Sequence, residues 1–160
     1  MAAGRISSLH ELFALASPLV GYLAYRSPGG IVAVALEAAV LATISLGSLA
    51  FFPGKVISQY LPGGPVTPLL GISVAHGVII PIAIAMIPHS VPPTMLGMAF
   101  AVFEVLGSIL HLTDIVFGWL RDVTGGYDIP MKLLFSYSLI ATCLLWMTRH
   151  RIRLPPSVVE

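Results

Sequence analysis

Long, nearly unbroken runs of apolar residues dominate the pattern of this chain. An α-helix needs about 20 mostly apolar residues to cross roughly 30 Å of hydrocarbon, so runs of this length predict membrane-spanning helices. We expect five such spans, at about residues 6–25, 31–52, 68–87, 97–120 and 131–148. The second run is the cleanest, with Glu37 as its one charged residue, whereas His10, Glu11 and Pro18 interrupt the first.

Segments rich in Pro and Gly separate these runs, at residues 27–30, 53–67, 88–93 and 121–130. Such segments punctuate helices because Pro lacks a backbone N–H and Gly adopts turn conformations. The pattern therefore predicts an all-α fold. We expect one polytopic transmembrane bundle over residues 1–153 and a short cytoplasmic tail at residues 154–160.

Composition supports a membrane protein. Of the 160 residues, 57% are hydrophobic and 9% are charged, and the mean hydropathy is +0.95. A soluble domain carries about 25% charged residues because water must wet its surface. A disordered chain needs low hydrophobicity and high charge. Both classes are excluded, and the lipid bilayer is the partner that covers the apolar surface.

Charge adds an orientation to this picture. The net charge is +1 and the pI is about 8.0, so no strong basic field attracts nucleic acid. Lys and Arg are enriched in cytoplasmic loops, and Arg149, Arg151 and Arg153 after the last span predict a cytoplasmic C-terminus. With five spans, Arg26 falls on the same side. The other basic residues fall on the opposite side: Arg5, Lys55, Arg121 and Lys132.

Small residues recur every four positions along the second run, at Ala35, Ala39, Thr43 and Gly47. This spacing places them on one helix face, where small side chains let two helix backbones approach closely in lipid. The pattern predicts a helix-packing face and implies no chemistry.

The fourth run carries three ionisable residues, Glu104, His111 and Asp114. At 100° per residue, an α-helix places them within one arc of about 80°. An ionisable residue in mid-bilayer costs at least about 2.5–3.5 kcal/mol, so such residues persist where they pair or line a wet pathway. This line can relay protons or hold a cationic or peptide-like solute. The competing interpretation is that the three residues satisfy one another, or that Asp114 snorkels to the helix end.

Other runs contain further candidates for a substrate or proton pathway. His76 stands near the middle of the third run, where a hydrogen bond to a neighbouring carbonyl is the alternative interpretation. Glu37 lies one to two turns inside the second run and can snorkel. His10 and Glu11 stand close to a terminus, where exposure to the membrane interface costs little.

The pattern does not support metal or enzyme chemistry. No two of the five histidines have the i, i+3 or i+4 spacing of helical metal sites, and Cys143 is the only cysteine. A G-x-S-x-G turn, a phosphate loop and G-x-G-x-x-G are also absent. We therefore expect no metal, no cofactor and no enzymatic activity. A haem between His76 and His111, or an intramembrane redox or hydrolytic enzyme, is the third alternative.

Two junctions carry a more specific pattern. After the fourth run the chain reads Gly118-Trp119-Leu120-Arg121-Asp122-Val123-Thr124-Gly125-Gly126-Tyr127, which fits G-x-L-x-D-x-x-G. This resembles the motif that major facilitator superfamily transporters place at helix–loop junctions, in the D-x-T-G-G-Y form typical of the step from helix eleven to helix twelve. Residues 17–23 resemble the S-P-L-x-G-x-L ending of helix eight, with Gly21 in the motif. The family usually has Asp there, whereas this chain has Tyr25 and Arg26, so the resemblance does not extend to the family's gating salt bridge.

Residues 70–100 are similar to the helix ten to eleven region, so the resemblance covers nearly the whole chain. It implies that the five runs correspond to helices eight to twelve of a twelve-helix transporter, of which this chain is a fragment. Such transporters rock one six-helix half against the other around a midplane site. The implied partners are a small organic solute and either the missing N-terminal half or a partner membrane chain.

Within the superfamily, the chain is most similar to members that export dipeptides from the lysosome as uniporters. This implies dipeptide export from a lysosome or vacuole, by uniport or linked to protons. A monocarboxylate or a sugar is the alternative substrate, and the plasma membrane is the alternative location. The alternative function is a non-transporting scaffold or accessory subunit that binds another helix through the small-residue face.

Overall fold

Helices are the only regular elements among the described residues. The computed structural model describes residues 22, 24, 26, 27, 30–52 and 54–149, and within them the side chains of Leu110 and His111 are not described. In chain order the elements are α3 (Gly30–Phe51), α4 (Gly54–Tyr60), α5 (Val66–Ser90), the 3-10 turn η1 (Pro93–Met95), α6 (Leu96–Thr124) and α7 (Asp128–Thr148). No strand occurs in this part of the chain, which confirms the all-α fold class.

Four of these helical segments are long and apolar enough to cross a membrane: α3, α5, α6 together with η1, and α7. They coincide with the second to fifth predicted runs. By length and composition the protein is therefore a multi-pass membrane protein. The first predicted span, residues 6–25, lies outside the described residues except for positions 22 and 24, and Gly21 lies outside them too.

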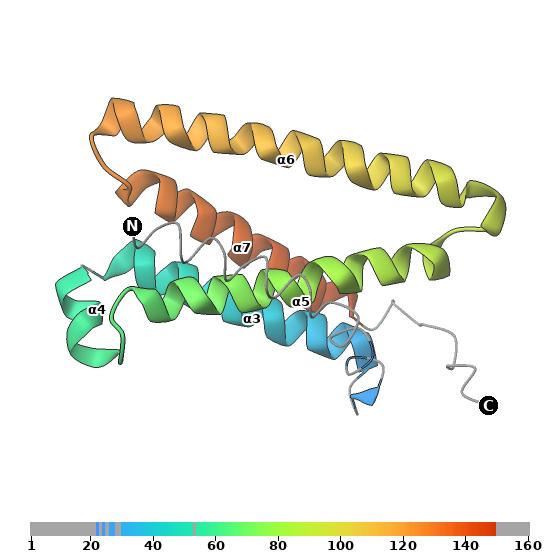
Figure 1. Ribbon diagram of the computed structural model, residues 1–160, viewed down its shortest axis with the longest axis horizontal. Coiled ribbons are helices and arrows are strands. Elements are labelled where there is room, and N and C mark those ends of the chain that lie inside the picture. Colours follow the sequence, from blue (N-terminus) through green and yellow to red (C-terminus); the bar gives the residue numbers. More distant parts are fainter. Residues whose placement is uncertain (1–21, 23, 25, 28–29, 53, 150–160) are drawn as a thin grey trace.

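The helix α3 is the centre of the packing, because both α5 and α7 lie along it (Figure 1). Both neighbours run antiparallel to α3. Ile31 near the start of α3 belongs to the same apolar cluster as Ile82 in the second half of α5. Ala24 and Ala35 complete the buried part of this cluster, and Leu145 of α7 packs against it.

The predicted small-residue face of α3 packs against α7. A Cβ atom added to Gly47 would lie 3.0 Å from Cε2 of the Phe135 ring, so a larger residue here would require the ring to shift. Thr43 Oγ1 lies 2.8 Å from Ser138 Oγ, also on α7. Close backbone approach through small residues is the usual means of helix association in lipid. The sequence expectation for this face is confirmed, and its neighbour is α7.

The helix α6 lies apart from this three-helix core. Figure 1 shows it running beside the core, near α5 at one end and near α7 at the other. None of its residues whose burial is described is buried. Large apolar side chains on it remain more than half exposed, for example Val105 at 58%, Ile115 at 69% and Trp119 at 62%. Lipid or further helices must cover this apolar surface.

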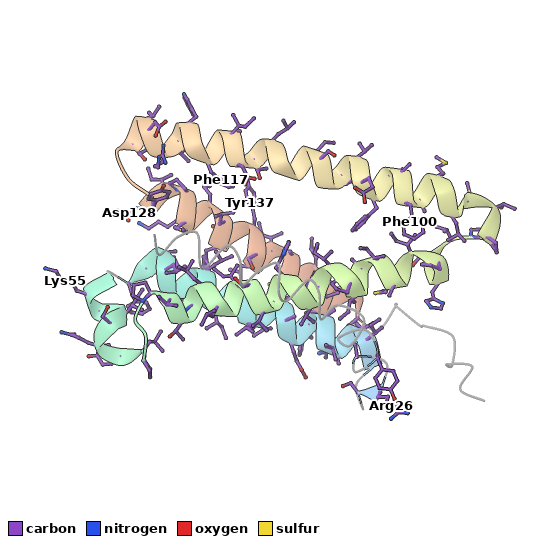
Figure 2. The ribbon with its side chains drawn as sticks, viewed as in Figure 1. Arg26, Lys55, Phe100, Phe117, Asp128 and Tyr137 are labelled. Carbon is purple, nitrogen blue, oxygen red and sulfur yellow. The ribbon has the colours of Figure 1, made fainter. Side chains whose placement is uncertain are left out.

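Charged residues lie at the two ends of the bundle. Because α3 and α7 are antiparallel, Arg26 before α3 and Arg149 after α7 lie at one end, as the predicted orientation requires. Lys55 on α4 and Asp128 at the start of α7 lie at the opposite end (Figure 2). Aromatic rings accompany both arginines. Arg26 stands 4.7 Å from the Tyr22 ring centroid and Arg149 stands 3.4 Å from that of Trp146.

Candidate functional site

The depth of the predicted polar line follows from the length of α6. This helix has 29 residues, which is about 43 Å at 1.5 Å per residue. Glu104 stands eight residues after Leu96, roughly 12 Å from that end, and Asp114 stands ten residues before Thr124, roughly 15 Å from the other. In a hydrocarbon layer of about 30 Å, a centred helix of this length places Glu104 roughly 5 Å and Asp114 roughly 8 Å inside the edges of the layer.

The helix is continuous from Glu104 through His111 to Asp114, so the arc of about 80° expected from the sequence holds for its backbone. The side chains of Glu104 and Asp114 are exposed. The Glu104 carboxylate has no salt-bridge partner among the described residues. The nearby Ser108 hydroxyl donates instead to the Glu104 backbone carbonyl, at 2.9 Å. Glu104 and Asp114 are therefore exposed carboxylates within one arc of a largely apolar helix, and we call the line of Glu104, His111 and Asp114 the polar stripe.

The other two predicted pathway residues lie on different helices. His76 is exposed on α5 and Glu37 is exposed on α3. His76 stands 14 residues before the end of α5 and His111 stands 15 residues after the start of α6. Since these helices form a hairpin, both positions lie roughly 21–23 Å from the connecting turn, at one depth in the membrane. No described contact places Glu37 on the α6 stripe.

The loop motif folds into the corner between α6 and α7. Gly125 ends α6 in the left-handed conformation, with φ at 71°, which glycine adopts without steric cost. The Thr124 hydroxyl donates to the Leu120 carbonyl at 2.8 Å, and the Met131 backbone N–H donates to the Tyr127 carbonyl at 2.9 Å. Gly118 and Gly126 are half-buried beside this corner. Gly125 thus ends α6, and the chain turns into α7 within the motif.

Arg121 is the residue of this corner that the sequence pattern missed, because it occupies a variable position of the motif. Its Nε–H and Nη2–H groups both donate to Asp122 Oδ1, at 2.8 Å and 2.5 Å respectively. It also donates from Nη1 to the Tyr127 hydroxyl at 3.0 Å and stands 5.6 Å from the Tyr127 ring centroid. Arg121 therefore joins the two motif positions, Asp122 and Tyr127, across the turn.

No cluster of three or more His, Cys, Asp or Glu side chains with the geometry of a metal site occurs in the described part of the chain. In comparisons with known proteins, no family model, no curated protein and no solved structure matches the chain.

Proposed function

We propose that this chain is the C-terminal portion of a secondary transporter of the major facilitator superfamily, and that it moves a small organic solute across a membrane. One observation carries the proposal. Glu104 and Asp114 are exposed and lie within the hydrocarbon-spanning part of α6, a helix of which no residue with described burial is buried.

The energetic argument concerns the surroundings of α6. A charged side chain at the centre of the bilayer costs at least about 2.5–3.5 kcal/mol, and less nearer the ends of a span. The exposed carboxylates of Glu104 and Asp114 lie inside the hydrocarbon layer, so protein or water on their side of α6 lowers this cost. The helices α5 and α7 both pack against α3, and this packing leaves Glu104 and Asp114 of α6 exposed. A missing N-terminal half, or a partner membrane chain, would enclose the stripe and create a wet pathway at the membrane midplane, as in secondary transporters.

The chemistry of the stripe supports a class of solute. Two carboxylates with a histidine between them along the helix can hold an ammonium group or exchange protons with it. A dipeptide carries such an ammonium group, and the resemblance implies the same substrate, so we propose dipeptides first. A monocarboxylate or a sugar is the alternative. Export from a lysosome or vacuole is proposed on the resemblance alone, with the plasma membrane as the alternative.

The scaffold alternative meets a structural difficulty. It relied on the small-residue face of α3 as the surface for another helix. That face is occupied by α7, since Thr43 and Gly47 both contact α7 side chains. A scaffold would have to bind through α6 instead, and its partner would then have to accommodate the two carboxylates.

Uptake measurements on the complete transporter test the proposal. We expect Glu104→Gln to lower dipeptide uptake about tenfold or more, the effect of losing roughly 1.4 kcal/mol of interaction at the site. The matched control is Asp128→Asn, because Asp128 is exposed at the start of α7 and outside the stripe. Unchanged uptake by Glu104→Gln and by His111→Ala, at equal amounts of protein in the membrane, would contradict a role of the stripe in transport.

A further inference from the structure

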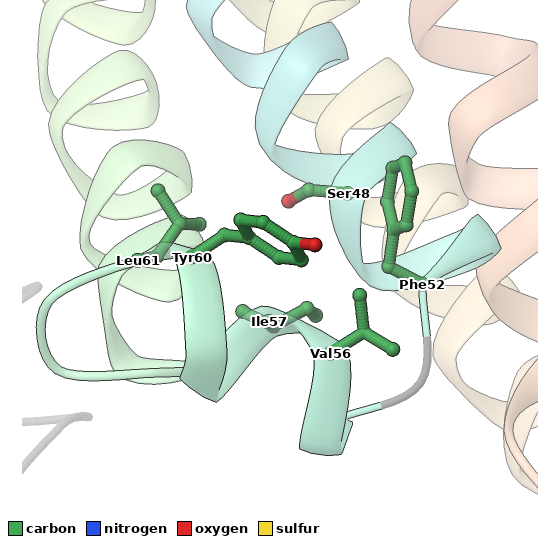
Figure 3. Close-up of a pocket in the computed structure, with 6 residues that line it drawn as sticks. All are labelled: Ser48, Phe52, Val56, Ile57, Tyr60 and Leu61. Atoms are coloured by element: carbon green, nitrogen blue, oxygen red, sulfur yellow. The ribbon is translucent and has the colours of Figure 1, made fainter.

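The short helix α4 and the end of α3 enclose an apolar cavity that the transport proposal does not use. Its volume is about 250 Å³ (Figure 3). Its lining residues come from the end of α3, from α4 and from the residues that follow each helix: Ser48, Phe52, Val56, Ile57, Tyr60 and Leu61. Ligand pockets for drug-sized molecules measure about 300–1,000 Å³, so this cavity suits a smaller or thinner group.

The cavity offers almost no free polar atom. Ser48 has its hydroxyl donating to the Ser45 carbonyl at 2.7 Å, so this group is already satisfied. Ile57 is 4% exposed and lies beneath the cavity. Figure 3 shows the Tyr60 side chain extending across the cavity between α4 and α3. A polar solute would lose its hydration here without gaining hydrogen bonds, whereas a hydrocarbon chain would lose nothing.

The position of the cavity places it at the boundary of the membrane. The span α3 ends at Phe51, and α4 follows directly as a seven-residue helix. Tyr60 is 80% exposed, and tyrosine side chains are enriched at the level of the lipid headgroups. The cavity therefore faces the upper acyl chains and the headgroups of one leaflet.

One charge accompanies the cavity. Lys55 is the only Asp, Glu, Lys or Arg in the 66 residues between Glu37 and Glu104. It stands on α4, next to the cavity-lining residue Val56, and is exposed. Figure 2 shows Lys55 at the end of the bundle, pointing away from it. A cation beyond an apolar slot matches the layout of an anionic phospholipid, whose phosphate lies outward of its acyl chains.

We propose that the corner between α3 and α4 binds one anionic phospholipid of the surrounding bilayer. One acyl chain occupies the cavity, and the phosphate contacts Lys55. This site is separate from the polar stripe of α6 and does not depend on the transport proposal. It would anchor the α3–α4 corner at a fixed depth in the membrane.

Photo-crosslinking of the full chain in lipid nanodiscs tests this site. Two probes carry the same photoreactive acyl chain, one on phosphatidylglycerol and one on phosphatidylcholine, and mass spectrometry locates the labelled residues. We expect labels within residues 48–61 and about fivefold more label from phosphatidylglycerol, since one lysine near anionic lipid contributes roughly 1 kcal/mol. Bulk lipid should label the exposed face of α6 equally from both probes, which provides the internal reference. Equal labelling of residues 48–61 by the two probes, or no label there, would overturn the proposal.

Two pairs of variants test the headgroup contact and the acyl-chain contact one at a time. Lys55→Gln should bring the ratio of the two probes close to one, whereas the control Lys132→Gln, an exposed lysine of α7, should leave the ratio unchanged. Ser48→Leu fills the cavity and should remove the label from both probes. Its control is Ser136→Leu, an exposed α7 serine whose hydroxyl also donates to a helix carbonyl. A wild-type ratio in Lys55→Gln, or wild-type labelling in a folded Ser48→Leu protein, would contradict the site.

Discussion

Thr43 of α3 and Thr142 of α7 converge on one backbone oxygen. The Thr43 hydroxyl lies 2.9 Å from the Ala39 carbonyl oxygen and the Thr142 hydroxyl lies 3.3 Å from it, while the two hydroxyls are 2.9 Å apart. Ser138 joins the same group from α7. This hydroxyl cluster ties together two antiparallel spans that are far apart in the sequence.

Replacing Thr142 should weaken this tie. Thr142→Val keeps the shape of the side chain and removes the hydroxyl, so we expect a loss of about 0.6–1.7 kcal/mol of stability, as for interhelical hydrogen bonds in membranes. The measurement is the thermal or denaturant unfolding of the chain in detergent. Thr148→Val is the control, because the exposed Thr148 hydroxyl bonds only within α7. Equal stability of the two variants would show that the cluster does not stabilise the bundle.

Packing at Gly47 leads to a second prediction. Gly47→Val would drive its side chain into the Phe135 ring, which also makes an edge-to-face contact with Phe51 at 5.2 Å between centroids. We expect a cost of about 1–3 kcal/mol, as for other overpacked cores. Gly107→Val on α6 is the matched control, since nothing lies within 4 Å of its added Cβ. The measurement is the unfolding of both variants under the same conditions. A similar loss of stability in Gly47→Val and Gly107→Val would contradict the contact between α3 and α7.

The corner after α6 provides a third prediction with a neighbouring control. Gly125 has a φ of +71°, whereas Gly126 has no positive φ, and both have open space around an added Cβ. Gly125→Ala should therefore cost roughly 1–2 kcal/mol through backbone strain alone. Gly126→Ala should cost less. Unfolding measurements that rank the two variants in the opposite order would show that the corner has a different backbone conformation.

A fourth prediction concerns orientation in the membrane. In a background with Cys143→Ser, single cysteines at Ser27 and at Ser58 would stand at opposite ends of α3. The arginine-rich end is expected to be cytoplasmic. A membrane-impermeant maleimide added from the cytoplasmic side should label Ser27→Cys and leave Ser58→Cys unlabelled. Labelling of both from one side would contradict the crossing of the membrane by α3.

Run length allowed the four described spans to be predicted from the sequence, because a stretch of about 20 apolar residues has few alternatives to a membrane helix. The helix ends were less predictable. The helix α6 continues past Leu120 to Thr124 and ends where Gly125 adopts the left-handed conformation. The helix α7 begins at Asp128 because an acidic residue and a proline both suit a first helical turn.

Other features were hidden from the sequence for physical reasons. The helix α4 lies in a segment read as a loop between Pro53 and Pro62, and seven residues are too few for a clear helical pattern. The spacing of Ala35 to Gly47 identified a packing face but contained no information on which helix covers it. The polar stripe of α6 was readable from spacing alone. The exposure of the Glu104 and Asp114 side chains, which carries the functional proposal, emerged only from the structure.

The size of the native product tests the central claim most directly. An epitope tag after Glu160 at the chromosomal locus, followed by a blot of membrane extracts, reports the length of the protein that contains this chain. We predict a band roughly two to three times 16.9 kDa, or a band near 17 kDa that co-purifies with a second multi-pass membrane chain. A band near 17 kDa without such a partner would leave the α6 carboxylates with no second half to face, and would contradict the account.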